Sequence, residues 1–242
     1  MAQLLLESDD NNMKTRRDAM KQLADHDDPR VVDFLIAQTH AEVDQAKRLE
    51  AIDVMGKEGG AKFLPRLHEM LKKERGYQVR TNVADALRRI GMVESVQPLL
   101  DVLKSEKKSQ VRSLLLRALM VCGGTRDEVQ KEIEKVLLRG DELDQVTIMS
   151  ELTKVAWDDR YEKGLAKCLK ANDSKVRVAA FWLAGTHKVE SARKPMKMRL
   201  SSEKNSARSA CAWALQALGE EVAEAGEDPS KEITDALPSA SF

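Results

Sequence analysis

Three stretches of this 242-residue chain share one skeleton in the same register. In each, a small or β-branched residue precedes an arginine, an Ala-Leu pair follows six and seven residues after that arginine, and a glycine stands eleven residues after it. The stretches are Tyr77–Gly91, Ser109–Gly124 and Asn205–Gly219. A skeleton kept over such distances indicates internal repeats, each too small to bury its apolar face without stacking on its neighbours.

The same register extends along most of the chain. Seven residue pairs, called marks below, occupy the place of the small residue and its arginine, and positions are counted from the second residue of each mark. The marks are Thr15-Arg16, Ala46-Lys47, Val79-Arg80, Val111-Arg112, Val146-Thr147, Val176-Arg177 and Ala207-Arg208. The steps between them are 31, 33, 32, 35, 30 and 31 residues. The fifth unit is degenerate, because Lys154 stands at a core position. We expect Ile148, Leu152 and Val155 to form its buried stripe.

Each unit is expected to be a pair of antiparallel helices. Val79, Val83 and Leu87 follow their mark at helical spacing, and a second apolar segment comes after a Gly or polar break. Pro65, Pro98 and Pro195 suit the first turn of that second helix, where a missing N–H costs nothing. With 33% charged and 4% aromatic residues and no strand pattern, the sequence predicts an all-α, right-handed α-α superhelix of about seven helical hairpins.

The repeated segments resemble the HEAT repeat, in particular the short bacterial type also found in phycobilin lyases. The resemblance rests on "QVR…ADALRRIG…VQPLLDVL" at 78–103, "QVRSLLLRALMVCG" at 110–123 and "DSKVRVAAFWLAG" at 173–185, and it covers about residues 14–219. It implies a HEAT/armadillo-like solenoid with a concave binding face. In this family the Val-Arg arginine typically reaches an acidic residue of a neighbouring unit. Here only Asp173 stands at the expected place, four residues before Arg177.

The chain is expected to divide into a HEAT-like solenoid over 1–219 and an acidic tail over 220–242. The tail holds seven acidic residues and one lysine, in a chain whose formal net charge is zero. We expect a mobile tail, and the alternative is a cap folded onto the last unit.

Few features point to catalysis, a metal or a membrane. Four scattered histidines lack a His or Cys partner at i, i+4, so no metal site and no cofactor are expected. Three isolated cysteines at helix-interior positions predict buried thiols in a reducing compartment. No apolar run approaches the length of a membrane span, so we expect a cytoplasmic protein.

One column of the repeat varies where the core positions do not. Five residues after each mark stand Lys21, Ile52, Asp85, Arg117, Leu152, Trp182 and Trp213. Tryptophan and arginine are enriched in binding hot spots. The sequence therefore predicts a non-enzymatic adaptor that binds a protein or peptide on the concave face through Trp182, Trp213, Arg117, Arg88 and Asp85. The alternative placement turns both tryptophans into the core.

Two other functions stay open. HEAT-like alkylpurine DNA glycosylases use aromatic residues and an aspartate, which would assign catalysis to Asp158 or Asp159 beside Trp157. The bland interpretation is that Trp157 packs in the core and Asp158 caps the next helix. A basic patch, Lys188, Arg193, Lys194, Lys197 and Arg199, could track phosphates, meet an acidic protein or the tail, or be solvated. The repeat subtype alone suggests an accessory tetrapyrrole lyase. The partner and the oligomeric state are left open.

Overall fold

The computed structural model describes residues 7, 10, 12–24, 26, 28–58 and 60–240. Within these residues all regular structure is helical: the chain forms α-helices α2 to α15 and four short 3-10 helices, with no strand. The all-α prediction is confirmed for this part of the chain.

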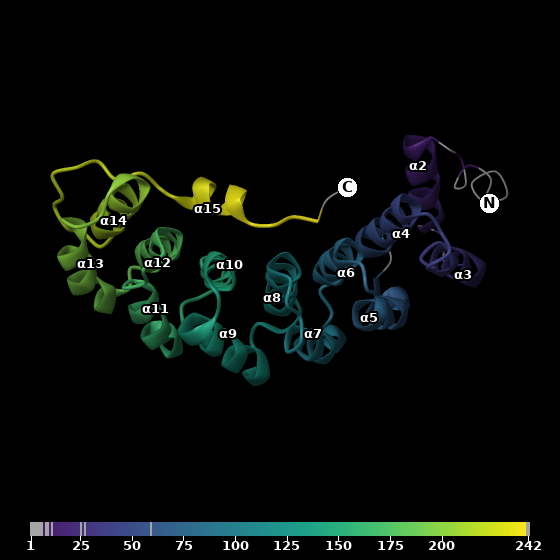
Figure 1. Ribbon diagram of the computed structural model, residues 1–242, viewed down its shortest axis with the longest axis horizontal. Coiled ribbons are helices and arrows are strands. Elements are labelled where there is room, and N and C mark those ends of the chain that lie inside the picture. The colour runs from purple at the N-terminus through teal and green to yellow at the C-terminus, as the bar shows by residue number, and fades with distance from the viewer. Residues whose placement is uncertain are drawn as a thin grey trace. The chain divides into compact units, whose positions relative to one another are not determined.

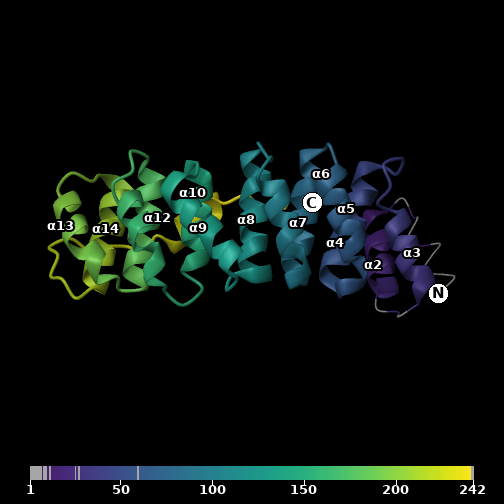
Figure 2. The ribbon, with the colours of Figure 1, turned by 90° about the horizontal axis from the view of Figure 1, so that it is seen from below.

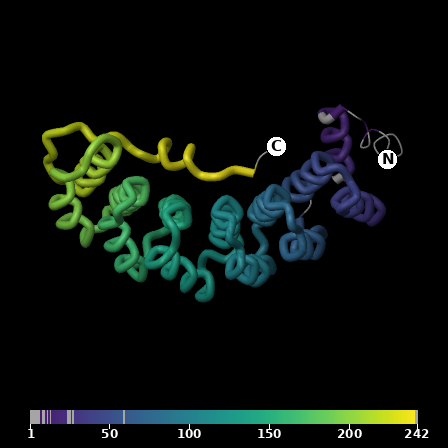
Figure 3. Tube along the Cα trace, in the orientation of Figure 1, coloured from purple at the N-terminus to yellow at the C-terminus, as the bar shows by residue number. Residues whose placement is uncertain are grey.

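Within each of the two compact units described below, even-numbered and odd-numbered helices alternate along the chain and form an even layer and an odd layer of that unit, which the tube in Figure 3 traces. The even layer carries the arginine register and consists of α2 (Met13–Ala24), α4 (Gln45–Glu58), α6 (Tyr77–Ile90), α8 (Ser109–Gly123), α10 (Glu142–Leu152), α12 (Ser174–Thr186) and α14 (Asn205–Ala217). The odd layer consists of α3 (Pro29–Ala37), α5 (Leu64–Lys73), α7 (Val96–Leu103), α9 (Asp127–Arg139), α11 (Glu162–Cys168) and α13 (Arg193–Leu200). A last helix, α15 (Ser230–Ala236), follows the repeats.

The chain forms two compact units: the first comprises the residues up to Gly124 together with those after Pro238, and the second spans Thr125–Pro238. In unit 1, α2, α4, α6 and α8 pack in sequence, and α5 and α7 pack on the helices that follow them. In unit 2, α10, α12 and α14 pack in sequence, backed by α9, α11 and α13 (Figures 1 and 2). The predicted boundary between repeats and tail at Gly219 stays a prediction.

Local sequence explains where the helices begin and end. In α6 the buried Val79, Val83 and Leu87 lie at i, i+4 and i+8 on one side of the helix. Gly91 closes α6 at a φ of 68°, a left-handed conformation that glycine adopts without strain. At the start of α3, Asp28 caps the Arg30 N–H and Pro29 fills the first helical position.

Two glycines allow the even helices to approach closely. A Cβ on Gly56 in α4 would lie 2.7 Å from the Ala86 Cα in α6. A Cβ on Gly185 in α12 would lie 2.9 Å from the Ala214 Cα in α14 and 2.5 Å from the Trp213 ring. Both glycines stand eight residues after the arginine of their helix, so the same close contact recurs in the two units.

A ladder of arginine–glutamate pairs connects successive repeats. Arg16 pairs with Glu50 at 2.6 Å, Arg80 with Glu106 at 2.7 Å and Arg177 with Glu203 at 2.7 Å. In each of these pairs two guanidinium nitrogens donate to the two carboxylate oxygens. Arg48 and Glu74 form a further rung.

The ladder corrects the expectation built on Asp173. That residue instead caps α12, accepting from the Val176 N–H, while the acid that Arg177 reaches is Glu203. Glu74, Glu106 and Glu203 each stand 26 residues after their arginine, in the loop before the next even helix. Burial opposes ionisation of Glu203, but the hydrogen bonds from Arg177 and the charges of Arg177 and Arg199 hold its pKa below the usual range.

The ladder also corrects the register of two units. Arg48, not Lys47, is the fourth residue of α4, as Arg80 is of α6, and the arginines at 16, 48, 80 and 112 are 32 residues apart. In α10 the fourth residue is Gln145, which donates to the Leu137 carbonyl at 3.0 Å. Ile148 and Leu152 are buried as predicted, but Val155 is 45% exposed because α10 ends at Leu152.

Candidate functional site

The corrected register redefines the variable column of the even layer. Five residues after the fourth position stand Lys21, Asp53, Asp85 and Arg117 in unit 1, and Ser150, Trp182 and Trp213 in unit 2. Ile52 and Leu152, which the sequence placed in this column, belong to the buried core. The column is therefore charged throughout unit 1 and carries two tryptophans in unit 2.

In unit 1 buried carboxylates hold guanidinium groups at the surface. The Asp53 carboxylate, 2% exposed, accepts from Arg89 at 2.6 Å and from Lys57 at 2.8 Å. Asp85, 8% exposed at its side chain, pairs with Arg88 at 2.9 Å and with Arg89 at 2.7 Å. Of the contact candidates Asp85 and Arg88, Asp85 is thus buried behind the arginines, and Arg88 reaches the surface. Arg117 is half-buried in the next helix.

In unit 2 one tryptophan of this column is buried and the other is half-buried. Trp182 is only 8% exposed and Trp213 is half-buried, its ring against Gly185. Trp182 therefore follows the alternative in which the column turns inward near the C-terminus. Whether either tryptophan contacts a partner stays a prediction.

The C-terminal segment, residues 220–238, runs along the even layer of unit 2. Figure 1 shows it in yellow beside α14, α12 and α10, and α15 packs on both α12 and α10. Ile233 of α15 is 4% exposed, so this helix buries an apolar anchor. Within the described residues, the segment predicted to be mobile has defined contacts on the last repeats.

Side chains of α14 hold the main chain of this segment. The Gln216 amide donates to the Glu224 carbonyl at 2.9 Å and accepts from the Gly226 N–H at 3.4 Å. The Glu227 N–H donates to the Ser209 hydroxyl at 3.0 Å. A Cβ on Gly226 would lie 2.0 Å from the backbone nitrogen of Trp213, so the segment touches the α14 backbone directly. Ser209, Trp213 and Gln216, at i, i+4 and i+7, form one face of α14.

Glutamates of the segment neutralise part of the basic patch. Glu220 pairs with Arg193 at 2.6 Å and with Lys197 at 2.5 Å, and these cations lower its pKa. Glu224 forms a two-pronged pair with Arg208 at 2.6 and 2.5 Å, which lowers the pKa of Glu224. Arg208 occupies the ladder position of α14, so Glu224 supplies its rung. Arg199 pairs with Glu203, and Lys188 and Lys194 are exposed.

The Asp158 and Asp159 pair lies at the start of α11. Asp158 accepts from the Arg160 N–H at 3.0 Å and caps the 3-10 turn before the helix, as the capping interpretation predicted. The Asp159 carboxylate accepts from the Trp157 ring N–H at 3.1 Å. Trp157 is half-buried against the rings of Tyr161 and His187. The catalytic role of these aspartates stays a prediction.

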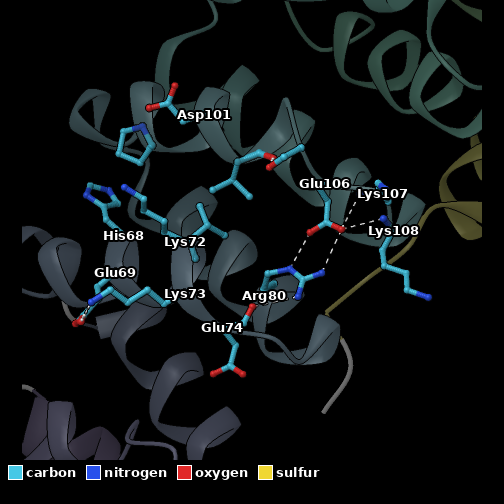
Figure 4. A pocket seen from close by; sticks show the side chains of 14 residues that line it. His68, Glu69, Lys72, Lys73, Glu74, Arg80, Asp101, Glu106, Lys107 and Lys108 are labelled. Carbon is cyan, nitrogen blue, oxygen red and sulfur yellow. Dashed lines mark hydrogen bonds and ion pairs between the residues drawn. The ribbon is translucent and has the colours of Figure 1, made fainter.

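A separate cavity of about 830 Å³ lies on the odd layer of unit 1 (Figure 4). Arg80 and Glu106 of the ladder line it, and Glu106 also accepts from the Lys107 and Lys108 N–H groups at 2.9 Å. His68, at another side of the cavity, lies 3.0 Å from the Ser95 hydroxyl, and burial lowers its pKa. The structural ladder and the loop before α8 thus account for the bonds of Arg80 and Glu106 at this cavity.

Other groups with catalytic potential are inert or scattered in the part of the chain that the structure describes. No three His, Cys, Asp or Glu side chains gather there as a metal site. Burial raises the pKa of the Cys122 thiol to about 11 and those of Cys168 and Cys211 to about 12. These three thiols are free and buried, as predicted. No helix among the described residues is long and apolar enough to cross a membrane.

The residues that hold the C-terminal segment were missed in the sequence. Ser209 and Gln216 are ordinary polar residues of an amphipathic helix, and only their i, i+7 spacing around Trp213 marks a common face. Gly226 lies in an acidic stretch that matches no repeat. The sequence did allow a contact between the basic patch and the tail, and the pairs of Glu220 bear out that possibility.

Comparison with known proteins gives a family match over part of the chain and similarity of fold to two solved structures. Residues 32–120 match the family of HEAT repeats. No curated protein matches the chain. The structure is similar to the complex of CpcE and CpcF of phycocyanin lyase from Nostoc sp. PCC7120, with a TM-score of 0.51, 19% identity and coverage of 98% of this chain and 93% of that chain. Human deoxyhypusine hydroxylase, solved with glycerol, has a TM-score of 0.44, 18% identity and coverage of 90% and 83%.

Proposed function

We propose that this chain, a HEAT-like helical solenoid, is a non-enzymatic scaffold or adaptor that binds a protein or peptide on the face of its even layer. The observation that carries the proposal is the charged network of unit 1. Arg88 and Arg89 are fixed by the buried carboxylates of Asp53 and Asp85, so their guanidinium groups are preorganised while they remain partly exposed. Preorganised arginines lose little conformational entropy when a partner binds.

The neighbouring surface adds an apolar contact. Val121 in α8 is 49% exposed and occupies the same repeat position as Arg89 in α6. An exposed apolar side chain beside fixed arginines has the composition of a protein interface. Glutamates of the chain itself pair with Arg193, Lys197 and Arg208, which supports a protein ligand over a nucleic-acid backbone. We also place the protein in the cytoplasm, on the support of its three buried, free thiols.

Photo-crosslinking tests the proposal. Benzoylphenylalanine is introduced in place of Val121 on the even layer or, as a control, in place of the exposed Gln97 on α7 of the odd layer. We expect the Val121 probe to capture a protein from the native lysate and the Gln97 probe to capture none. Adding Arg88→Glu should reduce the capture at Val121 several-fold. Equal capture at both positions, or none at either, would contradict the proposal.

A further inference from the structure

The even layer of unit 2 already holds a peptide, the chain's own C-terminal segment. Its main chain forms hydrogen bonds with two side chains of α14: the Gln216 amide donates to one carbonyl and accepts from one N–H, and the Ser209 hydroxyl accepts from another N–H. Contacts of this kind bind an extended peptide largely without regard to its sequence. Because Gln216 is exposed and belongs to a surface face of α14, it is not required for the core of the repeats.

Sequence selection comes from three other features of the same surface. Arg193 and Lys197 together bind the Glu220 carboxylate. Arg208 binds the carboxylate of Glu224, four residues later in the segment. Gly226 lies on the α14 backbone, where no side chain fits. Ile233 then seats a short helix on α10 and α12. The surface thus selects two carboxylates, a glycine and an apolar helical anchor, in that order.

We propose that this surface is a docking site for an acidic peptide of a partner protein, and that residues 220–238 are its built-in occupant. The inference rests on the proposed function and names a partner class for it. Charge complementarity supports an acidic occupant, because the three cations at this surface are partly exposed and already pair with glutamates of a peptide. A partner peptide would compete with the segment, which makes the segment an intramolecular competitor.

The test uses a fluorescein-labelled synthetic peptide with the sequence of residues 220–238, and fluorescence anisotropy with the full-length chain. Gly226→Val opens the site, because any Cβ at this position meets the α14 backbone. Ala225→Val, at the exposed neighbouring residue, is the matched control. We expect the peptide to bind Gly226→Val at least tenfold more tightly than it binds the wild type or Ala225→Val. Equal affinity for all three chains overturns the inference.

A charge exchange tests the recognition itself. Arg208→Glu added to Gly226→Val should weaken the labelled peptide at least tenfold, and a peptide carrying Glu224→Arg should restore the loss. Binding that ignores both changes overturns the assigned contacts. If circular dichroism shows that Gly226→Val loses helix, Glu224→Arg replaces it, because this change removes a contact of the built-in segment and leaves the receiving surface intact; Glu221→Arg, at an exposed residue of the segment, is its control. The expected gain in peptide affinity is then at least threefold, and no gain overturns the inference.

The two proposals can fail separately. If the peptide fails to bind the opened chain while Val121 still captures a protein, the docking site is wrong and the scaffold function stands. If the peptide binds the opened chain and Val121 captures nothing, the docking site stands and the proposed partner face of unit 1 is wrong.

Discussion

The even layers of the two units share one frame and present different faces. Both carry Arg–Glu rungs, as Arg80–Glu106 and Arg177–Glu203 show, and both use a glycine for close helix contact. The column five residues after the arginine is charged in unit 1 and holds Trp182 and Trp213 in unit 2. The C-terminal segment packs on the tryptophan-bearing face.

This difference separates stability from binding within one repeat. The rungs and glycines fix the spacing of the helices, so the variable column is free to change its chemistry. A tryptophan at that column exposes a large apolar surface unless another segment packs on it. Covering that surface is favourable, because burying apolar surface stabilises the fold by roughly 25 cal/mol per Å². Asp53 and Asp85 at the same column are buried instead, and they pair with Arg88 and Arg89, which remain partly exposed.

The largest expected effect comes from removing the buried tryptophan. Trp182→Ala should lower the free energy of unfolding by about 3–5 kcal/mol, because the side chain is 8% exposed and its loss leaves a cavity. Trp182→Phe, which retains most of the volume, should lose about 1–2 kcal/mol. Urea denaturation followed by circular dichroism measures both. A loss below about 1 kcal/mol for Trp182→Ala would show that the column is not part of the core of unit 2.

Breaking an Arg–Glu rung should destabilise the fold less than Trp182→Ala does, and by the same amount in both units. Glu106→Gln in unit 1 and Glu203→Gln in unit 2 should each lower the free energy of unfolding by about 2 kcal/mol, because each leaves a largely buried arginine without its carboxylate. Markedly different losses in the same urea experiment would break the claim of a common frame.

The rung in unit 2 also predicts a pH dependence. The pKa of Glu203 is lower in the folded chain than in the unfolded chain, so its stabilisation is complete above about pH 4.3 and is lost as the pH falls through the folded pKa. The stability difference between wild type and Glu203→Gln should therefore shrink when urea titrations are repeated from pH 7 down to pH 3. A difference that stays constant would mean that ionised Glu203 does not stabilise the fold.

Close helix contacts should respond alike in the two units. Gly56→Ala pushes a methyl group onto the Ala86 backbone, and Gly185→Ala meets the Ala214 backbone and the Trp213 ring. Each should lower the free energy of unfolding by about 1–2 kcal/mol. Thermal melts of both variants measure this loss. Gly60→Ala is the comparison, because its site has open space but a positive φ, so it reports backbone strain without crowding. Gly56→Ala or Gly185→Ala at wild-type stability would refute the close approach.

The smallest effect on stability is expected at the face of unit 1. Arg88→Ala should cost about 0.5 kcal/mol, because the pair with Asp85 is partly exposed and Arg89 still neutralises that carboxylate. The same change should nevertheless reduce capture at Val121. Large destabilisation without a change in capture would make the network structural only.

The repeat spacing predicted the fold because stacked helical pairs must repeat their core positions, and the structure follows them at Val79, Val83 and Leu87. The rule that a small residue precedes the arginine chose Lys47 over Arg48 and moved that unit by one position. The rungs of Arg48, Arg80 and Arg177 were missed because their glutamates stand 26 residues downstream, in loops that carry no apolar pattern.

The occupied face could not be predicted from local patterns. Its contacts join Gln216 and Ser209 to main-chain atoms of residues 224–227, and main-chain atoms leave no signature in a sequence. The charges of Glu220 and Glu224 indicated an attraction to basic residues, but charge alone does not fix which of the nearby cations each glutamate pairs with. The burial of Trp182 likewise depends on how α12 is rotated, which a one-residue uncertainty in register obscures.

Hydrogen–deuterium exchange of residues 226–236 tests most directly the claim that the face of unit 2 holds the C-terminal segment. In the wild-type chain we expect these amides, including those of Gly226, Glu227 and Ile233, to exchange at least tenfold more slowly than in the free peptide of residues 220–238. Exchange as fast as in the free peptide would contradict the account, because the segment would then leave the tryptophan face uncovered.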